Sequence, residues 1–137
     1  MVYLDSSTVL RVLLRQPRPL AIWGRWERAY TSELLGVEAR SVLDRLRLET
    51  LLDDAGVAQA HEDLRAIERS IGRVALTRAV LQRASLSMPT VVKTLDGIHL
   101  ATALLLRERR NISLTFATHD DQQATAARAL GFDFVGV

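Results

Sequence analysis

Short apolar runs alternate along this chain with longer segments in which apolar residues recur every three or four positions. A short apolar run bounded by turn residues is typical of a strand, and a recurrence of three to four is typical of a helix. The runs predict strands over residues 2–4, 29–31, 73–76, 114–117 and 134–135. The pattern therefore predicts strands that are separated by helices.

The longer segments predict helices over residues 9–15, 33–48, 58–71 and 96–109, with shorter helices around residues 22–26, after Thr77 and ending at Leu130. Ser32 and Thr77 stand where an N-cap hydroxyl is favoured, and Gly131 stands at a preferred glycine position beyond a helix end. Residues 16–19 contain two prolines and predict a turn.

Alternating strands and helices predict an α/β fold: a three-layer α/β/α sandwich with a central parallel sheet of about five strands. The 137 residues are enough for one domain, which we expect to span residues 1–137. Parallel sheets of this kind bind ligands at the carboxyl ends of their strands. Residues that directly follow a strand are therefore the first candidates for chemistry.

Composition narrows the classes of function. The chain has no cysteine, which excludes disulfides, thiolate nucleophiles and cysteine-based zinc sites. No apolar run approaches the ~18 residues that a membrane span requires, so we expect a cytoplasmic protein with no membrane contact. All 18 basic residues except Lys93 are arginine, while the net charge is only +2. Arginine suits phosphate binding, but a GC-rich genome explains the same bias.

Four acidic residues occupy positions that favour a function. Asp5 and Asp120 directly follow predicted strands, and Asp96 begins a strongly apolar helix. Each of these aspartates is also explained as a helix cap or a turn residue. Glu38 is harder to explain, because it lies within the apolar stripe of the helix over residues 33–48.

If these carboxylates converge, they need a cation or a proton. Two carboxylates about 5 Å apart repel by roughly 3 kcal/mol at an effective dielectric constant of 20. Since the four carboxylates provide only oxygen ligands, the cation that fits them best is Mg²⁺, with Mn²⁺ as the alternative. Such a site suits phosphodiester hydrolysis by metal-activated water.

The motifs around these acids resemble those of PIN-domain nucleases. The opening strand and aspartate are VYLDSS at residues 2–7, and the second motif is SELLGVE at residues 32–38. The third is LDGIHLATA at residues 95–103, and the fourth is FATHD at residues 116–120. The four motifs run in order over essentially the whole chain, with the size and layout of VapC-type toxins of bacterial toxin–antitoxin pairs.

The resemblance implies a Mg²⁺-dependent endoribonuclease that cleaves RNA. Asp5 and Asp96 match the principal metal ligands, and Glu38 completes the acidic cluster. Asp120 matches the acid that helps to bind a second metal or orients the attacking water. The implied partners are an RNA substrate, a cognate VapB-like antitoxin and a second copy of the chain in a homodimer.

Ser7 and Thr118 match supporting polar positions that hold the carboxylates. Gly97 departs mildly from the family pattern, which often has alanine there. Asp121 has no role in the pattern and is expected to face solvent. We expect His99 to be packed or hydrogen-bonded, and His119 to be dispensable.

Other functions remain as alternatives. A PIN-like fold could bind RNA or a protein partner without cleaving, although the full set of four acids argues against this. Haloacid-dehalogenase-type enzymes need an aspartate where this chain has Ser7, and receiver domains need a lysine after a late strand, whereas Lys93 precedes a helix. The aromatic residues Trp23, Trp26 and Tyr30 suit the core first, an antitoxin groove second and RNA stacking last.

Overall fold

Five short strands form one parallel sheet at the centre of the protein. The computed structural model describes all residues, 1–137. The strands are β1 (Val2–Leu4), β2 (Ala29–Ser32), β3 (Gly72–Val74), β4 (Thr115–Ala117) and β5 (Asp133–Val135). Their order across the sheet is β3-β2-β1-β4-β5, and every neighbouring pair is parallel. The predicted five-stranded parallel sheet is confirmed.

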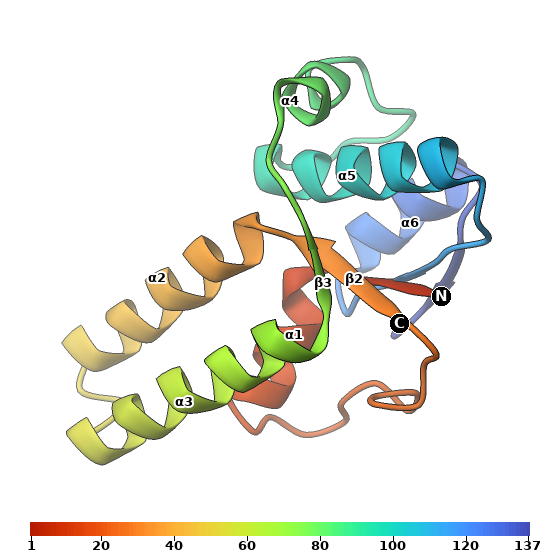
Figure 1. Cartoon of the computed structure of the whole chain (residues 1–137). Coiled ribbons are helices and arrows are strands. Elements are labelled where there is room, and N and C mark those ends of the chain that lie inside the picture. The colour runs from red at the N-terminus through yellow and green to blue at the C-terminus, as the bar shows by residue number, and fades with distance from the viewer.

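Helices cover both faces of the sheet (Figure 1). They are α1 (Ser6–Leu13), α2 (Leu34–Leu48), α3 (Asp54–Ser70), α4 (Arg78–Ala84), α5 (Thr94–Arg110) and α6 (Asp121–Ala129). The helices α1 and α3 pack on one face, whereas α5 and α6 pack on the other. Helix α2 packs on α1 and α3, and the pair formed by α2 and α3 extends beyond the sheet in Figure 1.

Strand β1 shows how the two cores form. Val2 and Leu4 are buried in the core beneath α1 and α3, while Tyr3 is buried in the core beneath α5 and α6. Successive side chains of a strand point to opposite faces, so a central strand with helices on both sides is apolar throughout. This explains why the strand appears in the sequence as an unbroken apolar run.

Several boundaries differ from those predicted. The predicted short helix around residues 22–26 is wrong, because residues 21–24 form only a turn, which ends at Gly24 with a φ of +76°. Helix α1 begins at Ser6 rather than residue 9. Helix α3 begins at Asp54 rather than residue 58, because the Asp53 side chain accepts a hydrogen bond from the Gly56 N–H.

The expected aromatic group is split by the sheet. Trp23 and Trp26 pack edge to face, with ring centroids 5.1 Å apart, and lie partly buried against the core beneath α1 and α3. Tyr30 is buried on the opposite face of the sheet. Packing in two separate cores therefore accounts for all three side chains.

The strand order gathers the candidate residues at one edge. Because β1 lies between β2 and β4, the residues that follow these three strands meet at their carboxyl ends. Helix α1 follows β1, α6 follows β4, and α2 follows β2. No helix in the structure is long and apolar enough to cross a membrane.

Candidate functional site

Asp5 lies at the centre of the acidic cluster and is only 2% exposed. Its Oδ2 atom accepts hydrogen bonds from Ser7 Oγ at 2.9 Å and from Thr118 Oγ1 at 2.8 Å. Although Asp5 occupies the N-cap position of α1, its side chain makes no cap hydrogen bond. The cap interpretation of this residue is therefore wrong.

Backbone groups fix the direction of those two hydroxyls. The His119 N–H donates to Ser7 Oγ, and the Asp120 N–H donates to Thr118 Oγ1, each at 3.0 Å. Each hydroxyl has a single proton to donate. Because its oxygen accepts a hydrogen bond from a backbone N–H, the hydroxyl is oriented so that its own proton points to Asp5. The β4–α6 loop therefore orients the Asp5 carboxylate.

The other oxygen of Asp5 has no such partner. Asp5 Oδ1 is buried and accepts no hydrogen bond, and the nearest basic side-chain nitrogen is His99 Nε2 at 4.0 Å. A buried carboxylate oxygen without a partner is costly and demands an explanation. A bound cation would supply the missing partner.

Asp96 lies close enough to Asp5 and Asp120 for their negative charges to affect its titration. Burial, followed by the charges of Asp5 and Asp120, raises the pKa of Asp96 to about 6. Asp120 is the N-cap of α6, where its Oδ1 accepts a hydrogen bond from the Gln123 N–H at 2.9 Å. Asp120 thus acts as a cap and also belongs to the cluster. Asp96 belongs to the cluster too, but it lies in the first turn of α5, whose N-cap residue is Lys93, so the cap interpretation of Asp96 is wrong.

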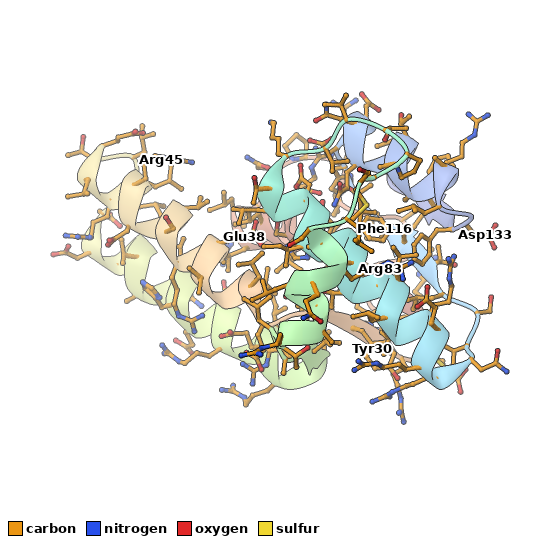
Figure 2. The ribbon with its side chains drawn as sticks, turned by 90° about the horizontal axis from the view of Figure 1, so that it is seen from above. Tyr30, Glu38, Arg45, Arg83, Phe116 and Asp133 are labelled. Atoms are coloured by element: carbon orange, nitrogen blue, oxygen red, sulfur yellow. The ribbon has the colours of Figure 1, made fainter.

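Glu38 reaches the cluster through His99. Glu38 Oε1 lies 2.6 Å from His99 Nε2, and Glu38 Oε2 accepts a hydrogen bond from Ser6 Oγ at 3.2 Å. Since a carboxylate can only accept, Nε2 must donate. Figure 2 shows Glu38 on α2, near the start of α5, with Arg45 farther out along α2. Each oxygen of Glu38 therefore already has a protein partner.

His99 is fully buried between these acids. Burial lowers its pKa, but the hydrogen bond to Glu38 and the charges of Asp5, Glu38 and Asp96 outweigh that effect and raise the pKa above its usual value. Its Nδ1 lies 2.8 Å from the hydroxyl of Tyr3. Burial and the charge of Asp5 raise the pKa of Tyr3 well above its ordinary value, so this hydroxyl stays neutral.

The contacts of His99 and Gln123 in the site were not predicted from the sequence. The expectation that His99 is hydrogen-bonded is correct, but its link to Glu38 depends on a contact across 61 positions of the chain. Gln123 was missed: it is fully buried, and its Nε2 donates to the Asp96 carbonyl oxygen at 3.0 Å. Its Oε1 is buried without a partner. The available signal was a glutamine on the buried face of an alanine-rich helix.

His119 and Asp121 lie outside the cluster of interacting acids. The His119 ring donates from Nδ1 to the Gly136 carbonyl oxygen at 2.8 Å, which ties the β4–α6 loop to the C-terminal segment. Asp121 is exposed, as expected.

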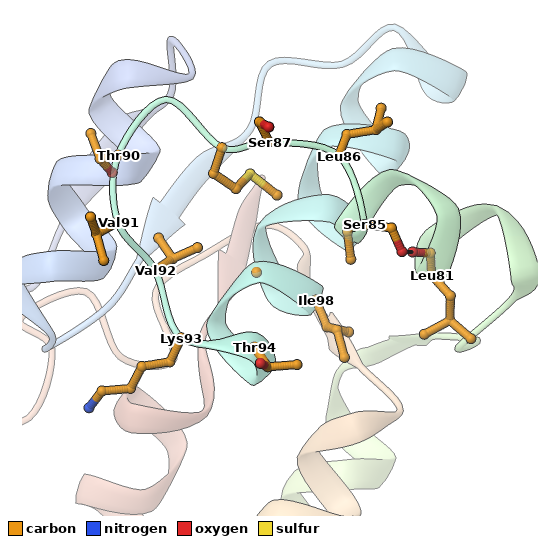
Figure 3. Close-up of a pocket in the computed structure, with 13 residues that line it drawn as sticks. Leu81, Ser85, Leu86, Ser87, Thr90, Val91, Val92, Lys93, Thr94 and Ile98 are labelled. Carbon is orange, nitrogen blue, oxygen red and sulfur yellow. Dashed lines mark hydrogen bonds between the residues drawn. The ribbon is translucent and has the colours of Figure 1, made fainter.

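A pocket of about 620 Å³ lies at the start of α5, and none of the four acids lines it (Figure 3). It lies between α4, the segment over residues 85–93 and Gly97 with Ile98 of α5. Its side chains include Leu81, Met88 and Val92, and Lys93 is the one charged residue that lines it. This pocket is mainly apolar.

The cluster fits a hard divalent cation held partly through water. The orphaned Asp5 Oδ1 and the mutual repulsion around Asp96 both call for positive charge. No three histidine, aspartate or glutamate side chains already stand as direct ligands around one point. Mg²⁺ accepts this arrangement, because it keeps several waters and binds through one or two carboxylates.

Comparisons with known proteins show similarity over most of the chain. Residues 2–129 match a family model described as PIN domain. The chain is 31% identical over 134 residues to Ribonuclease VapC46 of Mycobacterium tuberculosis (strain ATCC 25618 / H37Rv), covering 95% of this chain and 92% of that protein. It is 28% identical over 139 residues to Ribonuclease VapC47 of the same species (strain CDC 1551 / Oshkosh), covering 96% and 93%.

Two solved structures share the fold. The structure of FitAB bound to an IR36 DNA fragment has a TM-score of 0.69 at 18% identity, covering 98% of this chain and 94% of that chain. The structure of VapBC2 from Rickettsia felis bound to a promoter DNA fragment has a TM-score of 0.69 at 9% identity, covering 98% of both chains.

Proposed function

The chain belongs to the PIN domain family, and we propose that it is a divalent-metal-dependent endoribonuclease that acts as the toxin of a type II toxin–antitoxin system. Its full-length similarity to two proteins named ribonucleases supports the reaction class. The observation that carries the proposal is the buried Asp5 Oδ1, which has no hydrogen-bond partner. Asp96 and Asp120 add negative charge nearby, which increases the need for a cation at this place.

We assign Asp5 and Asp96 as the principal ligands of Mg²⁺, which Mn²⁺ can replace. Asp120 keeps one carboxylate oxygen beyond its cap bond for a second metal or for the attacking water. Glu38 completes the cluster, and because both of its oxygens have protein partners, we expect it to contact the metal through water.

When bound, the metal ion would supply an activated water and stabilise negative charge on the phosphate. The chain's own residues position the groups. Ser7 and Thr118 hold Oδ2 of Asp5 and leave Oδ1 free, while His99 holds Glu38. Water oxygen bonds to phosphorus as the P–O ester bond breaks, which leaves a hydroxyl on one RNA fragment and a phosphate monoester on the other.

The proposed partners follow from the relatives. FitAB and VapBC2 are two-component complexes in the structures that share this fold. We infer a cognate VapB-like antitoxin and a homodimer for this chain. A toxin that cuts RNA would act in the cytoplasm. Expression without the antitoxin should arrest growth, and co-expression of a small neighbouring gene product should relieve the arrest.

The direct test is RNA cleavage by the purified protein. With Mg²⁺ or Mn²⁺ it should cut total RNA, whereas EDTA, Asp5→Asn and Asp96→Asn should each abolish cutting. Asp121→Asn is the matched control, because Asp121 is exposed and lies beside Asp120 in sequence. Cleavage that survives EDTA or both site substitutions contradicts the metal-dependent mechanism.

The second candidate is a PIN-like module that binds RNA or a partner without cleaving. The saturated hydrogen bonding of Glu38 is the observation that favours it, since a structural role alone explains that residue. This candidate predicts RNA or antitoxin binding with no cleavage of any RNA, including structured RNAs, in either metal.

A further inference from the structure

A groove of about 320 Å³ leads away from Asp120 between α1 and α2. Ser7, His119 and Asp120 line its inner end, so the groove is continuous with the acidic cluster. The remaining lining residues come from α1, α2 and the turn after α1: Leu10, Arg11, Leu14, Gln16, Val42 and Arg45. We call this feature the α1–α2 groove.

The two arginines of the α1–α2 groove carry charge that no acid neutralises. Neither Arg11 nor Arg45 takes part in any ion pair, although Asp120 lines the same groove. Arg11 donates only to the Arg18 carbonyl oxygen, at 3.2 Å. A guanidinium group that lacks an acidic partner is free to bind a phosphate in a bidentate manner.

Other arginines of α2 are used differently. Arg40 forms a 2.7 Å ion pair with Glu68, and Arg47 forms a 3.1 Å ion pair with Asp44. The helix dipole favours a cation at position 45 and at position 47 alike, since both lie in the last turn of α2. Only Arg45, however, lines the groove and lacks an acidic partner.

The groove also offers apolar surface beside its charges. Leu10, Leu14 and Val42 are partly buried and line the groove together with the two arginines. A volume near 320 Å³ is at the small end of ligand sites and suits a unit of about one nucleotide. The apolar lining would contact a ribose or base while the guanidinium groups contact phosphates.

We propose that the α1–α2 groove binds the RNA strand next to the cleaved phosphate, with Arg11 and Arg45 contacting the phosphodiester backbone. This inference rests on the proposed ribonuclease function. Asp120 lines the groove and also belongs to the acidic cluster, so an RNA strand in the groove would lie beside the proposed cleavage site. The pocket in Figure 3 is a poorer path for a polyanion, because Lys93 is its one cation among mainly apolar side chains.

The test measures RNA binding apart from cleavage. A fluorescein-labelled single-stranded RNA is titrated with Asp96→Asn protein in a series of salt concentrations, using fluorescence anisotropy. Arg11→Gln and Arg45→Gln are added to this background, singly and together. Arg47→Gln is the matched control, because Arg47 lies on the same helix but outside the groove.

Each phosphate contact on a single strand contributes about 0.7 to the slope of log affinity against log salt concentration. Each single substitution should therefore lower the slope by about 0.7, and the double substitution by about 1.4. Arg47→Gln should leave the slope unchanged. In the cleaving protein, the two groove substitutions should raise KM more than they lower kcat.

The proposal is overturned if the slopes of Arg11→Gln and Arg45→Gln match that of Arg47→Gln, or if the Asp96→Asn protein binds no RNA. It is also overturned if both groove variants bind RNA normally but lose a protein partner, because the groove is then a protein site. Failure of the wild-type protein to cleave RNA would instead count against the proposed function. The two outcomes are therefore separable.

Discussion

At the scale of single residues, the two oxygens of Asp5 have different surroundings. Oδ2 accepts two hydroxyl hydrogen bonds, whereas Oδ1 accepts none. The order of motifs in the sequence was enough to select Asp5, Ser7 and Thr118. It could not show which oxygen stays free, because that depends on where the β4–α6 loop places the His119 and Asp120 N–H groups.

Asp96→Asn should stabilise the metal-free protein at neutral pH. The folded-state pKa of Asp96 is about 6, above an unfolded value of about 3.9, so the folded state binds the proton more tightly. Stability is therefore lost as pH rises from about 4 to about 6. Because Asp96 is partly exposed, solvent screening reduces the cost of its ionised form in the folded state to about 1 kcal/mol at pH 7.5. Asp96→Asn removes this cost and should raise Tm by about 3 °C.

Thermal melts in EDTA at pH 4 and pH 7.5 check this expectation. The difference between Asp96→Asn and wild type should appear at pH 7.5 and nearly vanish at pH 4, where Asp96 is protonated in the fold. A difference of equal size at both pH values, or a less stable variant at pH 7.5, contradicts the electrostatic account.

At the scale of elements, the starts of α5 and α6 are joined by Gln123. Its side chain bonds the Asp96 carbonyl oxygen, and its backbone N–H bonds the Asp120 carboxylate. The sequence predicted α5 from its strongly apolar character, and α6 from its alanine content and from Gly131 beyond its end. It could not place them side by side, because nothing local in either segment encodes a bond across 27 positions.

Gln123→Leu should weaken metal binding about tenfold. The loss of a residue that positions metal ligands typically lowers metal affinity 10-fold or more. Leucine nearly fills the same volume but cannot bond the Asp96 carbonyl. Titration with Mn²⁺ measures the affinity directly. Gln122→Leu is the control, since Gln122 is exposed on the same helix. Equal affinities for the two variants would show that Gln123 only fills space.

The C-terminal segment packs against the β4–α6 loop at Thr118. Thr118 N–H donates to the Val135 carbonyl oxygen, and Gly136 packs on the carbonyl of Thr118 with a φ of +109°. A Cβ at Gly136 would lie 2.2 Å from Thr118 O. The Phe134–Val135 strand was predicted, but this close approach beyond it is a tertiary feature.

Gly136→Ala should therefore lower the free energy of unfolding by about 2 kcal/mol or more, from backbone strain and overlap. Gly24→Ala provides the comparison, because Gly24 also has a positive φ but open space around it. Its cost should be about 1 kcal/mol. Urea unfolding of both variants measures the difference, and a cost at Gly136 no larger than at Gly24 would refute the packing argument.

At the scale of the whole molecule, the small net charge hides an uneven distribution. At least four of the sixteen acidic residues gather at one edge of the sheet, so the remaining surface is more basic than the total of +2 suggests. The sequence predicted the α/β class, the parallel sheet and the four acids. It placed Trp23, Trp26 and Tyr30 correctly in the core but as one group, whereas the strand pleat buries Tyr30 on the opposite face of the sheet.

A divalent cation should stabilise the whole fold by relieving repulsion within the cluster. A concentration ten times the Kd contributes about 1.4 kcal/mol, since the ion binds the native state. Differential scanning calorimetry should show a higher Tm with Mg²⁺ than with NaCl of equal ionic strength. Asp5→Asn should remove this increase, and an increase of equal size in Asp5→Asn would place the ion elsewhere.

The central claim is that water attacks the phosphate at the Asp5–Asp96 cluster, and cleavage in ¹⁸O-labelled water tests it most directly. A synthetic RNA is cut in the presence of Mg²⁺ or Mn²⁺, and the fragments are weighed by mass spectrometry. The account predicts one ¹⁸O atom in the new terminal phosphate and no product with Asp96→Asn. Fragments that end in unlabelled 2′,3′-cyclic phosphate would contradict it, because they arise from attack by the RNA's own 2′-hydroxyl.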